Sequence, residues 1–176
     1  MTRLGFALVF VLAGVTACAP PPPQLGADGK PLPRVYRITN EAEVTFRMLD
    51  GVNALRDAAG VQRLTLNAQL TAAAETHARD MSRQNRPWHF GSDGSSPLQR
   101  VARSGYPGLF KGELISETYE TELETLAAWM EEKGGRDVLL DPQARDIGFA
   151  WFQEPTGRLW WVLNTGAPDQ AAQVQN

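Results

Sequence analysis

The last third of the chain changes from a helical to an alternating apolar pattern, and this change constrains the fold more than any other feature. Residues 147–152 and 159–163 are rich in β-forming side chains and flank the turn sequence Glu154-Pro155-Thr156-Gly157, so they predict a β-hairpin. Both runs are apolar almost throughout and include Trp160-Trp161. We therefore expect the sheet to be covered on both faces, which requires helices on either side of it.

Helix-start signals precede the predicted hairpin at four places. Asn40 with Glu43 resembles a capping box, and Thr121 with Glu124 offers the same pairing. Asn67 can cap another helix, and Ser96 followed by Pro97 is a further start signal. The residues expected to face the core recur at helical spacing: Val44, Met48, Val52 and Leu55; Leu70, Ala74, His77 and Met81; Leu98, Val101 and Ala102; and Leu123, Leu126, Ala127 and Met130.

Together these elements predict one layered α+β domain at residues 35–166. Three of the helices are expected to end near Gly60, Gly105 and Gly134, and residues 113–119 are expected to add a strand. The segment is long enough for one hydrophobic core, and its length does not favour two. Residues 167–176 are polar and rich in glutamine, which is typical of a frayed tail.

The first 17 residues are typical of a signal peptide. Arg3 supplies a positive charge, and residues 4–15 form an apolar run too short for a membrane-spanning anchor. The run leads into Val15-Thr16-Ala17-Cys18, which resembles a bacterial lipobox with Cys18 as the first mature residue. The alternative is an ordinary cleavage site at Ala17, Cys18 and Ala19, but Pro20 would then follow the cut, where proline is poorly accepted. We expect acyl chains such as palmitate on Cys18 to anchor the protein to a bacterial membrane.

Residues 18–34 are predicted to form a tether, because Pro20-Pro21-Pro22-Pro23 and the glycines that follow favour extended chain and give little to bury. Cys18 is the only cysteine, so no disulfide is available and the domain relies on its core. The formal net charge is -3, and the basic residues are scattered singly. Nucleic acid is therefore not expected as a partner.

Five segments resemble the motifs of CAP-superfamily (SCP-like) domains, in the same order and at the same spacing. They are Leu70-x-x-x-Ala74-x-x-His77-x-x-Asp80-Met81; the run from His89 through Asp93-Gly94, Pro97 and Arg100 to Gly105-Tyr106; Gly112-Glu113-Leu114; the run from Trp129 to Pro142; and Ile147-Gly148-Phe149. The resemblance implies the three-layer α-β-α sandwich of that superfamily.

The resemblance also implies a cleft that combines two histidines with two acidic residues. His89 matches the first histidine, Glu113 matches the glutamate of the G-E-N motif, and Glu132 matches the second acidic position. Gly135 stands where the family has its second histidine. We therefore expect a ligand cleft formed by His89, Glu113 and Glu132, although Glu132 also fits the pattern of a solvated charge.

His77 is interpreted differently, because it lies on the apolar face of a predicted helix. A buried imidazole bonded to a carboxylate or a carbonyl is the expected role. His89 instead follows Pro87-Trp88 and precedes a loop of Gly, Ser and Asp residues, from which a side chain can project into a cleft.

One imidazole and two carboxylates make at most a weak, oxygen-rich metal site. We therefore expect no cofactor, with weak zinc binding by His89, Glu113 and Glu132 as the limit, and we expect Gly135→His to restore a zinc site. His89 and Glu113 are also the candidate catalytic pair, a general base oriented by a carboxylate. The domain has no cysteine and no G-x-S-x-G motif, so no nucleophile is evident.

Three functions fit these observations. The first is a non-catalytic module, anchored to the outer membrane and facing the periplasm in a host with two membranes, that binds an apolar or cell-wall ligand. The second is a divergent hydrolase of peptide or cell-wall material that uses His89 and Glu113. The third is a structural envelope protein with an unused cleft.

The mature N-terminus is predicted to be Cys18 carrying lipid, because the lipobox ends at the only thiol of the chain. Mass spectrometry of protein extracted from its own membranes checks this prediction, and Cys18→Ala should release the protein from the membrane fraction. An unmodified N-terminus at Pro20 would contradict it.

Overall fold

A computed structural model describes Lys30 and residues 36–169. The predicted signal peptide, Cys18, most of the predicted tether and the last seven residues lie outside this range. The described residues 36–169 belong to one compact unit.

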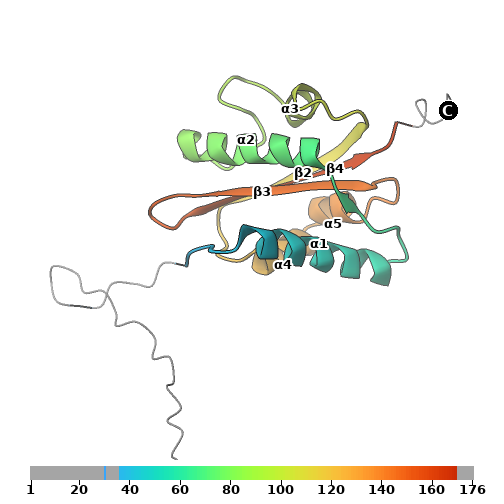
Figure 1. The fold of residues 1–176 in the computed structure, drawn as a ribbon, viewed down its shortest axis with the longest axis horizontal. Helices are drawn as coiled ribbons and strands as arrows, with labels where there is room; N and C mark the ends of the chain where they lie inside the picture. Colours follow the sequence, from blue (N-terminus) through green and yellow to red (C-terminus); the bar gives the residue numbers. More distant parts are fainter. Residues whose placement is uncertain (1–29, 31–35, 170–176) are drawn as a thin grey trace, which may run out of the picture. The chain divides into compact units, whose positions relative to one another are not determined.

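The domain is a three-layer α-β-α sandwich, as predicted (Figure 1). Its helices and strands follow the order α1 (Glu41–Ala58), β1 (Thr65–Leu66), α2 (Ala68–Gln84), α3 (Pro97–Arg103), β2 (Leu109–Ser116), α4 (Glu122–Glu131), α5 (Lys133–Leu139), β3 (Asp146–Gln153) and β4 (Leu159–Ala167). The sheet has the strand order β1-β3-β4-β2. Helices α2 and α3 cover one face, and α1, α4 and α5 cover the other.

The predicted capping residues begin the helices. The Asn67 side chain accepts hydrogen bonds from the backbone N–H groups of Gln69 and Leu70 in α2, and that of Asn40 accepts one from Glu43 in α1. Ser96 and Thr121 each form a complete capping box. Each cap satisfies backbone donors that the first helical turn leaves without partners.

The sheet is mixed, with β1 parallel to β3 and the other neighbouring pairs antiparallel. Every residue of β4 is buried, which confirms that helices cover both faces of the hairpin. On the α1 side, the ring of Phe149 stacks on Trp161 with centroids 5.7 Å apart, and Leu163 lies in the same cluster. On the α2 side, Trp160 and Val162 contact α2. The alternation of side chains along β4 thus divides the core into two layers.

The prediction for the fourth helix is wrong in its end and in its face. Gly134 does not end α4, because the chain leaves the helix at Glu132 and begins α5 at Lys133. Leu123 is 47% exposed, whereas Thr125 is fully buried. The buried face of α4 is therefore rotated from the one that its apolar residues suggest, since contact with α1 and α5 sets its orientation.

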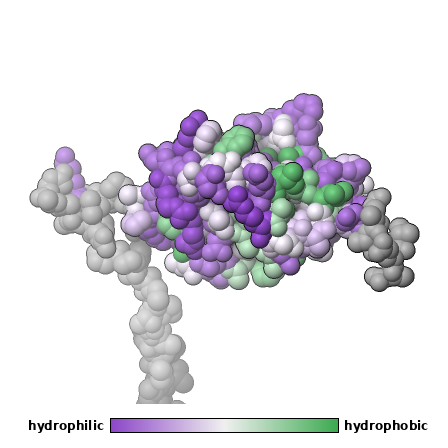
Figure 2. All heavy atoms as spheres, turned by 90° about the horizontal axis from the view of Figure 1, so that it is seen from above, coloured by the Kyte–Doolittle hydropathy of each residue, from purple (hydrophilic) through white to green (hydrophobic). Residues whose placement is uncertain are grey.

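Figure 2 looks onto the face of the domain that carries α2 and α3, where hydrophobic patches lie among hydrophilic residues. Within residues 36–169, no helix is long and apolar enough to cross a membrane.

Trp129→Ala is predicted to lower the free energy of unfolding by about 3–5 kcal/mol. The ring is 6% exposed in the core cluster, and its indole N–H donates to the carbonyl of Ile115 at 3.1 Å. Urea denaturation measures the loss. Trp129→Phe keeps most of the apolar surface and serves as the control, with a smaller loss. A loss below about 1 kcal/mol for Trp129→Ala would contradict burial.

Candidate functional site

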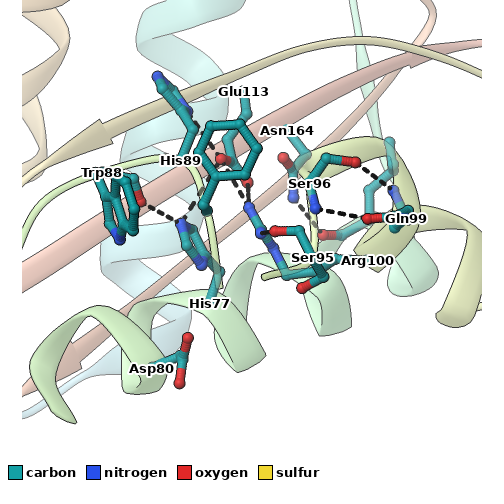
Figure 3. Close-up of polar contacts among 12 residues, drawn as sticks. His77, Asp80, Trp88, His89, Ser95, Ser96, Gln99, Arg100, Glu113 and Asn164 are labelled. Carbon is teal, nitrogen blue, oxygen red and sulfur yellow. Dashed lines mark hydrogen bonds and ion pairs between the residues drawn. The ribbon is translucent and has the colours of Figure 1, made fainter. Parts of the chain in front are cut away.

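The candidate site is centred on the carboxylate of Glu113 (Figure 3). Glu113 lies on β2 opposite Asn164 of β4, and its side chain is 2% exposed. Its neighbour Gly112 has no room for a side chain, because a Cβ there would lie 2.6 Å from Val138 of α5. The glycine thus lets α5 pack against the strand that carries Glu113.

Three cationic or imidazole groups converge on Glu113. The Nη2 atom of Arg100 donates to both carboxylate oxygens, at 2.9 and 2.8 Å. The Nδ1 atom of His89 lies 2.9 Å from Oε1, and the Nε2 atom of His77 lies 3.7 Å from the same oxygen. Because a carboxylate can only accept, Nδ1 of His89 carries the proton and Nε2 is left as the free ring nitrogen.

His89 is held in place by its neighbour Trp88. The indole N–H of Trp88 donates to the Gln84 side chain at 2.8 Å, and its carbonyl oxygen lies 3.0 Å from Nε2 of His77. The guanidinium of Arg86 lies 3.8 Å from the centre of the Trp88 ring. The side chain of His89 itself is 51% exposed. The neighbouring Trp88 is therefore fixed, while the imidazole of His89 reaches solvent.

His77 is a fully buried imidazole bonded to a carbonyl, as predicted. Burial lowers the pKa of His77; the charge of Glu113 opposes this effect and that of Arg100 adds to it. The ring is therefore neutral at pH 7, and Nε2 carries its proton because the carbonyl of Trp88 can only accept.

Asp80 anchors the loop that follows His89. Its carboxylate accepts from the backbone N–H and the hydroxyl of Ser92, at 2.7 and 2.6 Å. Gly91 in this loop has no space for a Cβ, which would lie 2.6 Å from Asp93. The Asp-Gly-x-x-Pro run thus folds back onto α2 and delivers Ser96 as the cap of α3.

The structure brings His89 and Glu113 together but does not add Glu132 to them. Glu132 is an exposed residue at the junction of α4 and α5. The described residues contain no group of three or more His, Cys, Asp or Glu side chains that could hold a metal ion. The expected set of His89, Glu113 and Glu132 is therefore not assembled as a metal site in this arrangement.

The expected effect of Gly135→His also needs correction. Gly135 is buried in α5, and a Cβ there would lie 1.9 Å from the carbonyl oxygen of Trp129. A histidine at this position would have to displace the end of α4. We therefore expect Gly135→His to destabilise the domain rather than to build a zinc site.

Arg100 and Asp80 are the site residues that the sequence interpretation missed. Both stand in motifs that resemble those of the CAP superfamily, but the sequence indicates no separate role for either. A signal was present for Asp80, because it follows His77 by three residues and so lies on the same helix face. For Arg100 the sequence offers no comparable sign of burial.

Acidification below pH 6.5 is predicted to destabilise the domain through His77. Burial lowers the pKa of His77 below its ordinary value of 6.5, so below this pH the unfolded chain binds a proton that the folded chain does not. The stability contribution is present above pH 6.5 and is lost as the pH falls towards the folded-state pKa. Urea midpoints at pH 7 and pH 5 should show a smaller loss for His77→Gln, whose amide still donates a hydrogen bond, than for the wild type. Equal losses would contradict this role.

Residues 49–165 match the family model described as the cysteine-rich secretory protein family, CAP. The uncharacterized protein YkwD of Bacillus subtilis (strain 168) is 26% identical over 114 residues, which cover 65% of this chain and 44% of that protein. The chain thus spans less than half the length of this relative.

Solved structures show the same fold. An outer surface protein of Borrelia burgdorferi superposes with a TM-score of 0.68 at 15% identity, covering 74% of this chain and 96% of that one. An extracellular protein of Bacillus anthracis that contains an SCP domain gives a TM-score of 0.64 at 18% identity, covering 74% of this chain and 45% of that one. With its family-model match spanning most of the domain, the chain belongs to the CAP family.

Proposed function

We propose that the protein is an exported, lipid-anchored binding module that holds an apolar or cell-envelope ligand beside His89. The names of two structural relatives, an outer surface protein and an extracellular protein, support export. The lipobox ending at Cys18 supports the anchor.

The proposal rests on the hydrogen bonds that the Glu113 carboxylate already accepts within the protein. Both carboxylate oxygens accept from Arg100, and one also accepts from His89. A carboxylate occupied in this way is a poor metal ligand and a poor general base, because a new partner would have to displace a buried cation. Among the side chains of the Glu113 cluster, that of His89 is the one that is half exposed, so its Nε2 is the atom placed to meet a ligand.

Exposed apolar side chains follow His89 along the chain, at the next residue and in the first turn of α3. Phe90 is 48% exposed and Leu98 is 60% exposed, although both are large and hydrophobic. The Trp88 and Phe90 rings lie 5.5 Å apart. An exposed aromatic ring next to an accessible imidazole suits a ligand that is largely apolar and carries one hydrogen-bonding group.

Native mass spectrometry of full-length protein purified from its own membranes tests the proposal. We expect a retained lipid or envelope component that His89→Ala and Leu98→Ala reduce by about tenfold. Leu109→Ala is the matched control, since Leu109 is 56% exposed and begins β2. A wild-type protein without any retained mass, or equal loss in the control, would contradict binding at this site.

A hydrolase is the second candidate, favoured by the orientation of His89. A carboxylate at Nδ1 and a free Nε2 suit a general base that activates water. The neighbouring hydroxyls are engaged: that of Ser92 donates to Asp80, and that of Ser96 caps α3. Turnover of cell-wall peptides by the wild type, abolished in a folded His89→Gln variant, would favour this candidate over the binding module.

A further inference from the structure

A cavity of about 420 Å³ lies between α2, the loop at residues 91–95 and α3, next to the candidate site. Ala72, Ala73 and Thr76 of α2 contribute to its lining and are small. Its charged lining residues include Arg83 of α2 and Arg103 of α3, whose side chains are 68% and 60% exposed. The helices α2 and α3 that border the cavity lie on the face of the domain seen in Figure 2.

Hydrogen bonds already saturate the buried carboxylate of the cavity. Asp80 is 6% exposed and accepts four hydrogen bonds, two from Ser92 and one each from Arg83 and Gln84. Each carboxylate oxygen thus has two donors, which fill its lone pairs. A ligand cation would gain little from Asp80.

The two exposed guanidinium groups are much less engaged. Among the hydrogen bonds of the described residues, Arg83 uses Nη2 alone, towards Asp80 at 3.1 Å. Arg103 uses Nη1 alone, towards Asp93 at 2.6 Å. A guanidinium has five N–H donors, so each arginine keeps most of its donors for a further partner. Arg83 and Arg103 therefore have donors to spare at the cavity wall. The carboxylate of Asp93, which also lines the cavity, already accepts from Arg103 and from the backbone N–H of Ser95.

We propose that this cavity binds a small organic carboxylate. The carboxylate accepts hydrogen bonds from Arg83 and Arg103, and a short apolar body rests against Ala72 and Ala73. Planar guanidinium groups match carboxylates in geometry as well as in charge. The volume falls within the range of small-molecule sites. Neither His89 nor Glu113 lines the cavity, although Asp80 and Arg100 of the neighbouring candidate site do.

Calorimetric titration of the full-length protein tests the proposal with N-acetyl-alanyl-alanine and with its C-terminal amide. We expect the acid to bind at least tenfold more tightly than the amide, because only the acid carries the charge. Arg83→Gln and Arg103→Gln should each weaken binding of the acid by about tenfold. Ala72→Leu, which fills the apolar wall on an exposed helix face, should weaken it as well.

Arg79→Gln is the matched control. Arg79 is an arginine of the same helix, is 51% exposed and does not line the cavity, so binding should be unchanged. Equal binding of acid and amide, equal loss in the control, or no binding of the acid at millimolar concentration would each overturn the proposal. Binding of inorganic phosphate with no binding of the acid would also overturn it, since the apolar wall would then have no part.

Discussion

The ion pair between Arg100 and Glu113 joins α3 to the sheet at a place where both side chains are buried. Arg100 is 6% exposed, the Glu113 side chain is 2% exposed, and each oxygen of the carboxylate meets the same guanidinium nitrogen. Removing one partner would leave an uncompensated charge in the interior, which costs several kcal/mol. Because Arg100 also donates to the carbonyl of Ser95, the pair fixes the loop that runs from His89 to α3. The position of the exposed imidazole thus depends on it.

Arg56, another buried cation, is stabilised in a different way. Its guanidinium has no carboxylate partner among its hydrogen bonds; it donates to the carbonyl oxygens of Gln62, Leu139, Asp141 and Ala144. Burial is the largest cause of its lowered pKa. The carbonyl dipoles offset part of the cost of desolvating the guanidinium. In return, Arg56 supplies donors to carbonyl groups near the ends of α1 and α5 that would otherwise lack them. Arg56 therefore ties the end of α1 to the segment between α5 and β3, on the face of the sheet opposite the candidate site.

Local signals in the sequence predicted the beginnings of the helices, but not their orientation. Asn67 and Thr121 act as caps through hydrogen bonds to residues two or three positions away, so their effect is visible in the sequence. The burial of Thr125 in place of Leu123 depends on how α4 lies between α1 and α5, which no local pattern specifies. The same holds for the site. The resemblance indicated His89 and Glu113, whereas the role of Arg100 appears only when α3 is placed beside β2.

The packing around position 135 explains why this site has one accessible imidazole and no room for a second one there. The junction of α4 and α5 brings the Trp129 carbonyl so close to Gly135 that no side chain fits. The other imidazole near Glu113 belongs to His77, which is buried and bonded to the Trp88 carbonyl. The Glu113 carboxylate therefore lies beside two histidines that differ in exposure: His77 is buried and structural, and His89 is open to solvent. Since Glu113 fixes the tautomer of His89, the cluster presents a single nitrogen acceptor in a defined direction, an arrangement suited to orienting a bound ligand.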